Sequence, residues 1–176
     1  MRQQADLEIQ GVSKAQSAHS FTLQPTKNLT TMDSKPNNKE LLIQFIEEVW
    51  NVGTIEASDK YIAPKYTIYH DPGDPWDKQE LDLHGYKERV RLSRAPFPDQ
   101  RFSIHDLLVD GNRVAITWHW VATHMGDIPG FPATGKRITM SGATVYYFES
   151  GRLTGHWQIA DRLGVYGQLR EGGLRT

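Results

Sequence analysis

Asp161 is the residue whose type and position suggest chemistry most directly. It follows residues 152–160, which are rich in aliphatic and aromatic side chains and therefore predict a β-strand. Strand side chains alternate between two faces, so it is expected to share a face with Leu153, Trp157 and Ile159. A carboxylate at the end of an apolar face is partly desolvated, which raises its pKa towards neutrality. This pattern favours a general acid or base at position 161.

A structural role for Asp161 is equally open. Residues 162–169 predict a short helix directly after it. Aspartate is one of the residues that cap a helix N-terminus through a side-chain oxygen. Perturbed carboxylates also occur in structural ion pairs. The residue types alone therefore leave two interpretations, a catalytic carboxylate and a helix cap.

Histidine supplies the second set of candidates, because it titrates near neutral pH without perturbation. Residues 113–124 predict a strand that places His124 on the same face as Trp118, beside a glycine- and proline-rich loop. His124 is therefore expected at the mouth of an aromatic pocket, either in chemistry or in a structural hydrogen bond. His70 ends an earlier predicted strand and is expected to reach the same pocket. His156 faces away from Asp161 by strand alternation, unless a bulge intervenes.

The chain offers little support for a bound metal or nucleotide. Four residues are candidate metal ligands: His70, Asp71, His84 and His124. They form no HxxxH, HxH or HExxH spacing, so no metal is expected. The sequence also has no Walker loop, GxGxxG motif or GxSxG elbow. We therefore expect no cofactor and no serine hydrolase chemistry.

The composition fits a soluble globular protein. The 176 residues are 38% hydrophobic and 10% aromatic, and they contain no cysteine, which excludes disulfides and thiolate chemistry. The net charge of −1 gives no reason to expect nucleic acid or an anionic membrane as a partner. No apolar run approaches the roughly 20 residues that span a bilayer. The N-terminus has no apolar segment of a secretory signal, so a cytoplasmic location is expected.

The order of helical and strand patterns predicts an α+β fold, with helices packed on one side of a curved sheet. Apolar periodicity predicts helices at 38–52, 55–62 and 83–94. Strands are predicted at 65–70, 101–109, 113–124, 136–149 and 152–160. Residues 1–37 and 171–176 are predicted to be tails outside the domain of residues 38–170. Three arginines of the third helix are expected to face solvent: Arg89, Arg91 and Arg94.

Six short motifs occur in order along residues 38–170. They are His70-Asp71-Pro72, Arg94–Asp99 (RAPFPD), Asp110–Ala115 (DGNRVA), Thr123-His124-x-Gly126, Gly130-x-Pro-x-Thr-Gly135 and His156-Trp157-x-x-x-Asp161. Together they resemble the SnoaL-like polyketide cyclase (ester cyclase) family. The resemblance implies a nuclear-transport-factor-like cone, in which about three helices and a curved antiparallel sheet enclose a ligand cavity. It also implies a homodimer formed through the outer face of the sheet.

The characterised cyclases of that family close a polyketide ester by an intramolecular aldol reaction without a cofactor. The resemblance implies that Asp161 removes an α-proton and later returns a proton. His124 and His70 would then hydrogen-bond the developing enolate.

The expected substrate is a small hydrophobic carbonyl compound. Trp118, Trp157 and Tyr147 are expected to shape the apolar walls of its pocket. Two alternatives stay open: hydrolysis or dehydration, with Asp161 activating water, and a ligand-binding or dimeric module without turnover.

Overall fold

The computed structural model describes residues 37–170, so the predicted tail at 1–37, except Asn37, and the predicted tail at 171–176 lie outside the described residues. The first helix, α1 (Asn38–Phe45), begins with a capping box. The Asn37 side chain accepts a hydrogen bond from the backbone N–H of Glu40 at 3.0 Å, and the Glu40 carboxylate accepts one from the Asn37 N–H at 3.2 Å. The chain continues into a π-helical turn, η1 (Ile46–Asn51), and leaves it through Gly53 at φ +86°.

The remaining elements follow the predicted order closely. They are η2 (Ile55–Ala57), α2 (Ser58–Tyr61), β1 (Ile62–His70), β2 (Glu80–Asp82), α3 (Leu83–Arg94), β3 (Arg101–Asp110), β4 (Arg113–Thr123), β5 (Arg137–Glu149), β6 (Arg152–Ala160) and α4 (Arg162–Arg170). Two differences stand out. The second predicted helix ends early because β1 begins at Ile62, and β2 has no counterpart in the prediction. Within residues 37–170, no helix is long and apolar enough to cross a membrane.

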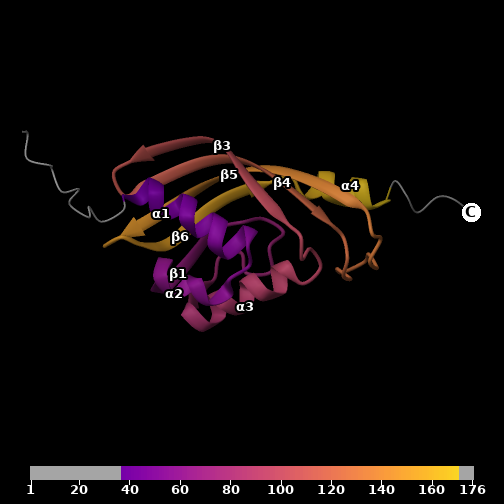
Figure 1. Cartoon of the computed structure of the whole chain (residues 1–176), viewed down its shortest axis with the longest axis horizontal. Helices are drawn as coiled ribbons and strands as arrows, with labels where there is room; N and C mark the ends of the chain where they lie inside the picture. The colour runs from indigo at the N-terminus through magenta and orange to yellow at the C-terminus, as the bar shows by residue number, and fades with distance from the viewer. Residues whose placement is uncertain (1–36, 171–176) are drawn as a thin grey trace, which may run out of the picture. The chain divides into compact units, whose positions relative to one another are not determined.

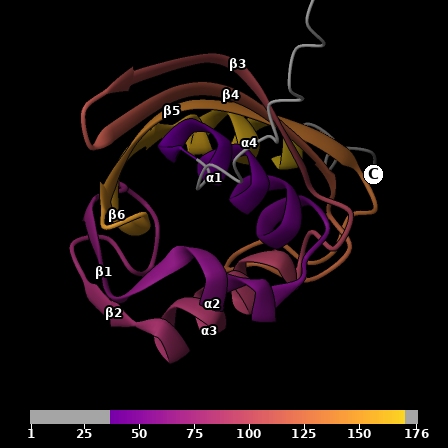
Figure 2. The same cartoon turned by 60° about the vertical axis from the view of Figure 1, so that its left-hand side comes forward.

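A single six-stranded sheet in the order β2-β1-β6-β5-β4-β3 organises the described domain. Neighbouring strands are antiparallel, except that β1 and β6 run parallel. The sheet curves, and α1 and α3 lie on its concave side while α4 lies beside one end (Figure 1). A view from another side shows the sheet arching over α1 (Figure 2). The α+β cone predicted from the sequence is therefore confirmed.

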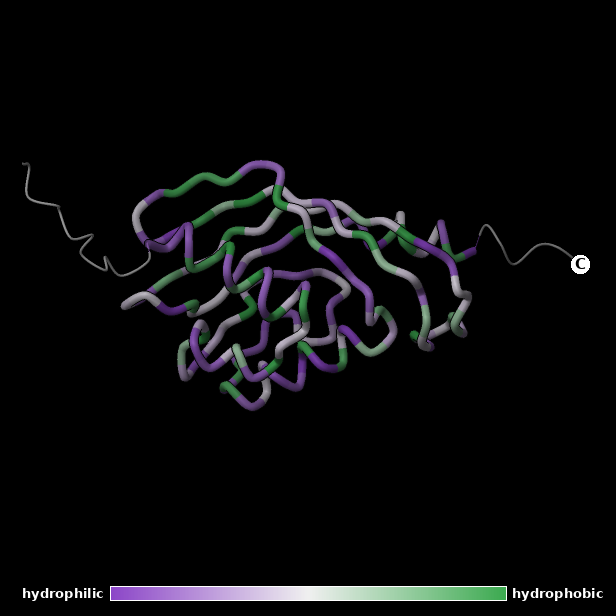
Figure 3. Tube along the Cα trace, in the orientation of Figure 1, coloured by the Kyte–Doolittle hydropathy of each residue, from purple (hydrophilic) through white to green (hydrophobic). Residues whose placement is uncertain are grey.

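The core lies between the concave face and the helices. Alternate residues of β4 face inward, so Val114, Ile116, Trp118 and Trp120 are all buried. They pack in one cluster with apolar side chains of α1 and α3 such as Phe45, which is fully buried. The alternation of hydrophilic and hydrophobic residues along the strands is visible in Figure 3.

A β-bulge in β6 changes which residues face inward. Tyr147 of β5 pairs with Gly155 while Phe148 pairs with Leu153, so Thr154 is an extra residue in β6. The alternation shifts by one residue at this point. His156 is consequently buried at 3% exposure, whereas Trp157 is 39% exposed. The predicted common face of Leu153, Trp157, Ile159 and Asp161 is therefore wrong beyond the bulge.

Candidate functional site

A cavity of about 420 Å³ lies under the concave face of the sheet. This volume falls within the range of roughly 300–1,000 Å³ that is typical of small-molecule sites. Its walls are rich in aromatic side chains and come from the sheet, η1, α3, α4 and the connecting loops. The aromatic lining residues are Trp50, Tyr66, Trp76, Tyr86, Phe97, Phe102, Trp118, Trp120, Tyr146 and Tyr166.

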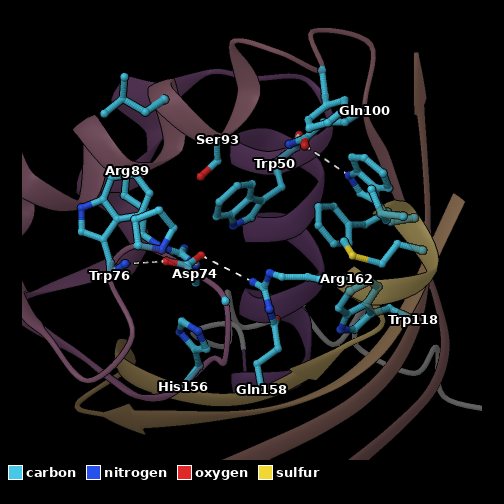
Figure 4. Close-up of a pocket in the computed structure, with 18 of the residues that line it drawn as sticks. Trp50, Asp74, Trp76, Arg89, Ser93, Gln100, Trp118, His156, Gln158 and Arg162 are labelled. Atoms are coloured by element: carbon cyan, nitrogen blue, oxygen red, sulfur yellow. Dashed lines mark hydrogen bonds and ion pairs between the residues drawn. The ribbon is translucent and has the colours of Figure 1, made fainter. Parts of the chain in front are cut away.

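One end of the cavity is charged: Asp74, Arg89 and Arg162 line it, and the two arginines pair with the buried Asp71 behind them. These four residues are here called the charged cluster. Arg89 Nη2 lies 2.9 Å from Asp74 Oδ2 and 3.3 Å from Asp71 Oδ2. Arg162 Nη1 lies 2.7 Å from Asp71 Oδ1, and its Nη2 lies 3.6 Å from Asp74 Oδ2. The two positive and two negative charges compensate one another. Figure 4 shows Arg162 reaching towards Asp74 across the cavity, above His156 and Gln158.

Asp71 is the most buried member of the charged cluster, with no solvent exposure. Burial alone would raise its pKa. The ring of His156 beside it, a hydrogen bond from Arg162 and the positive charges of Arg162 and Arg89 together outweigh burial and lower the pKa of Asp71 well below its usual range. Asp71 is therefore a stable anion that organises its neighbours, and it is a weak proton acceptor.

A buried Tyr–His pair lies next to the charged cluster. The Tyr66 hydroxyl lies 2.8 Å from His156 Nδ1, and both residues line the cavity. Burial raises the pKa of Tyr66 well above 10.0, so its hydroxyl stays protonated. Burial also lowers the pKa of His156 from 6.5, against the opposing effect of Asp71, so the imidazole is neutral at neutral pH.

These two protonation states assign the hydrogen-bond direction between Tyr66 and His156. His156 Nε2 faces Asp71 Oδ2 at 3.6 Å, an arrangement that favours a proton on Nε2. His156 Nδ1 is then an acceptor, and the Tyr66 hydroxyl donates to it. Among the described residues, Nε2 has no hydrogen-bond partner within 3.5 Å.

The carboxylate of Asp161 lies outside the cavity that the described residues form. It is exposed, and its Oδ1 accepts a hydrogen bond from the backbone N–H of Gly164 at 2.8 Å. Because this is the geometry of an N-cap, Asp161 caps α4, the second of the two roles that the sequence left open. The adjacent Arg162 carries its guanidinium into the cavity instead.

His124 directly follows β4 and is fully buried, on the side of the sheet that alternation predicted. Its Nδ1 lies 3.1 Å from Thr134 Oγ1, and its ring lies 5.4 Å from that of Phe97. Phe97 lines the cavity that the described residues form, whereas His124 lies behind it. The structure thus brings neither His124 nor Asp161 to the cavity surface.

The four remaining predicted site residues lie on both faces of the sheet. Trp118 lines the cavity, as expected. His70 and Trp157 stack on each other outside the lining of the described cavity, with ring centroids 5.1 Å apart. Tyr147 packs against Tyr69 on that outer side, while its neighbour in the chain, Tyr146, lines the cavity. Adjacent residues of a strand face opposite sides of the sheet, so Tyr146 faces the cavity and Tyr147 faces away from it.

Arg89 is a site residue that the sequence analysis assigned to solvent, which is wrong. It is 5% exposed, and its guanidinium carbon lies 5.5 Å from the ring centre of Trp50. Helical spacing contained a signal, because position 89 lies three residues after Tyr86 and four before Ser93, which also line the cavity. This signal was overlooked because the net charge of −1 gave no reason to expect a buried arginine.

Comparisons with known proteins identify the family of the chain. The family model for the SnoaL-like polyketide cyclase matches residues 40–169. A candidate polyketide cyclase from Acidithiobacillus ferrooxidans is 66% identical, with a TM-score of 0.74 over 80% of this chain and 99% of that one. IdmH from Streptomyces antibioticus, another candidate polyketide cyclase, is 25% identical, with a TM-score of 0.65 over 77% and 99% of the two chains.

A candidate cyclase from Jannaschia is 17% identical, with a TM-score of 0.64 over 75% of this chain and 90% of that chain, and shows the shared fold alone. None of the curated proteins compared with the chain matches it. With most of the described domain inside the matched region, this chain belongs to the SnoaL-like polyketide cyclase family.

Proposed function

We propose that this protein is a cofactor-independent enzyme that moves protons on a small hydrophobic carbonyl substrate, in the manner of an aldol cyclase or isomerase. The family and the candidate cyclase at 66% identity support this class of reaction. One observation carries the proposal: a Tyr66 hydroxyl 2.8 Å from His156 Nδ1, at the charged end of an aromatic cavity. Aromatic walls favour a flat apolar substrate, and the polar end orients its carbonyl groups.

In the proposed proton transfer, the Tyr66 oxygen receives the α-proton of the substrate as its own proton passes to His156 Nδ1. The imidazolium that forms is stabilised by the Asp71 carboxylate, which faces Nε2 at 3.6 Å. The electron pair of the broken C–H bond becomes an enolate. Reversal of the same transfer returns the proton after carbon–carbon bond formation or isomerisation.

The enolate oxygen needs hydrogen-bond donors, and Arg162 is the candidate that the cavity offers. A guanidinium has five N–H donors. Nη1 of Arg162 bonds Asp71 and, at 2.8 Å, the carbonyl of Pro72. Its side chain lines the cavity and is 22% exposed, so its remaining N–H donors can meet a substrate oxygen.

A second candidate function is a ligand-binding module without turnover. It is favoured by the charge balance of the charged cluster, in which Arg89 and Arg162 pair with Asp71 and Asp74. A carboxylate paired in this way is a weak base. In this account the cavity binds a hydrophobic molecule and leaves it unchanged.

Deuterium exchange separates the two functions without knowledge of the natural product. The purified protein is incubated in D₂O with a panel of aryl β-keto esters, and ¹H NMR follows loss of the α-proton signal. The proposed enzyme accelerates exchange over buffer, and His156→Asn, which keeps an acceptor for Tyr66 but cannot take up a proton, loses about 10²-fold or more of that rate. Binding of the esters without accelerated exchange would favour the module. Mass spectrometry of the same samples detects loss or gain of water, the outcome expected of a dehydratase or hydrolase.

A further inference from the structure

A hydrogen-bond chain runs along the cavity wall across neighbouring strands of the sheet. Trp118 Nε1 of β4 lies 2.8 Å from Thr144 Oγ1 of β5. Thr144 Oγ1 lies 2.7 Å from Gln158 Oε1 of β6. Gln158 Nε2 lies 3.2 Å from each carboxylate oxygen of Asp71, the residue that follows β1. The chain thus connects the aromatic wall to the charged cluster.

Each hydrogen bond of this chain has a fixed direction. An indole N–H can only donate, so Thr144 accepts from Trp118 and must use its single hydroxyl proton elsewhere. That proton goes to Gln158 Oε1, the carbonyl oxygen of the amide. The amide N–H₂ group is left facing Asp71, which as an anion can only accept.

Because the hydrogen-bonding groups of the chain are buried, breaking these hydrogen bonds would cost free energy. Thr144 is 1% exposed and Trp118 is 3% exposed, so water cannot easily replace either partner. A Cβ at Gly142, the residue of β5 opposite Trp118, would collide with the Trp118 indole, so the absence of a side chain there gives the ring its place. Trp118 and Gln158 line the described cavity, but Thr144 lies outside its lining.

We propose that Thr144 is a positioning residue, whose hydroxyl holds the Gln158 amide with its N–H₂ group on Asp71 and thereby sets the environment of His156. The arrangement itself is independent of any reaction, while its catalytic importance rests on the proposed function. Without the hydroxyl, the Gln158 amide is free to rotate and Asp71 loses a donor. The less solvated carboxylate then attracts the His156 imidazolium more strongly.

The test compares Thr144→Val, which removes the hydroxyl at nearly constant shape, with Thr144→Ser, which keeps it. NMR follows the imidazole Cε1–H signals of the full chain against pH, and the signal missing from His156→Asn assigns His156. In Thr144→Val the pH at the midpoint of the His156 titration should rise by about 0.5 pH units. This is the size of effect expected from the loss of one hydrogen bond, because one pKa unit corresponds to about 1.4 kcal/mol. In Thr144→Ser the midpoint should match the wild type.

Gln158→Met provides a second route, because it removes the amide directly from a half-buried position. It should shift the His156 midpoint in the same direction as Thr144→Val. The proposal fails if Gln158→Met shifts the midpoint and Thr144→Val does not, or if Thr144→Val and Thr144→Ser shift it equally. Near-ultraviolet circular dichroism verifies that each variant is folded.

The NMR titration needs no substrate, so it decides this proposal even if deuterium exchange is absent and the proposed function fails. If exchange is present at a pH where His156 is neutral, Thr144→Val should raise kcat by up to about threefold with KM unchanged, because an imidazole of higher pKa takes up the proton more readily. Thr144→Ser should keep the wild-type kcat. An unchanged kcat in Thr144→Val would contradict the catalytic part of the proposal.

Discussion

The Tyr66 hydroxyl and His156 Nδ1 lie 2.8 Å apart although 90 residues separate them in the chain. Parallel pairing of β1 and β6 places Ile68 opposite His156 and so brings the two strands into register at this point. The bulge at Thr154 then turns His156 inward. The only parallel pair within residues 37–170 and the bulge in its second strand therefore together create the proposed proton-transfer pair.

The pH dependence of folding should report on His156. Burial lowers its pKa in the folded state below 6.5, so the unfolded state binds more protons at acidic pH. The part of the unfolding free energy that depends on a neutral His156 is fully present above pH 6.5. It is lost as the pH falls below that value, by up to about 1.4 kcal/mol per pH unit. His156→Asn should therefore flatten the fall in unfolding free energy just below pH 6.5. Urea denaturation at a series of pH values measures it, and an unchanged slope would contradict the assignment.

Removal of Arg89 should be far more destabilising than removal of a neighbouring arginine. Its side chain is 6% exposed and pairs with Asp71 and Asp74, so Arg89→Met leaves two buried carboxylates with fewer counter-charges. We expect a loss of about 3–5 kcal/mol. Arg91→Met on the same helix, where the side chain is 62% exposed, should change stability by less than about 0.5 kcal/mol. Similar losses in the two variants by urea denaturation would count against a buried charged cluster.

The role of Asp161 as a helix cap predicts different effects of two substitutions. Asp161→Ala removes the oxygen that accepts from Gly164 and should cost about 1 kcal/mol. Asp161→Asn keeps an acceptor and should stay within a few tenths of a kcal/mol of the wild type. Thermal unfolding of both variants checks the difference. A large loss in Asp161→Asn would show that the charge itself is required.

Self-association through the outer face of the sheet remains a prediction from the family resemblance. Three apolar side chains on that face are exposed: Tyr69 at 52%, Trp157 at 39% and Ile159 at 46%. A two-fold interface would cover this face on both copies. Light scattering should give twice the chain mass of 20.1 kDa, and Ile159→Arg should give the monomer. Val52→Arg, at an exposed position after η1, is the control that should leave the dimer intact. A monomeric wild type at micromolar concentration would refute the prediction.

Much of the fold follows from local patterns in the sequence. Alternation in β4 correctly placed Trp118 on the inner face, and apolar periodicity from residue 38 correctly marked the start of α1. The site was harder to predict, because it depends on one extra residue in β6. Strand alternation cannot locate such a bulge, although Gly155, where a Cβ would collide with the backbone of Thr67, was a signal that the strand is irregular. The shift of one residue at this bulge places His156 at the cavity, where strand alternation had predicted Trp157.

The charged cluster illustrates a second limit. Asp71 and Arg89 are 18 residues apart, and nothing in their local sequence indicates that they form a buried pair. Their proximity results from the loop after β1 folding against α3. Only the helical spacing of Arg89 from Tyr86 and Ser93 indicated that Arg89 faces the cavity.

The central claim is that the proton-transfer group lies at the Tyr66–His156 pair and not at Asp161. The most direct measurement compares deuterium exchange of the same β-keto ester by wild type, Tyr66→Phe and Asp161→Asn under identical conditions. Tyr66→Phe removes one hydroxyl from the cavity and should lose about 10²-fold or more of the exchange rate. Asp161→Asn should keep the wild-type rate within about twofold, because the cap is preserved and the carboxylate lies outside the cavity of the described domain. The opposite result, in which Asp161→Asn loses the exchange activity and Tyr66→Phe keeps it, would contradict the account and return the acid–base role to Asp161.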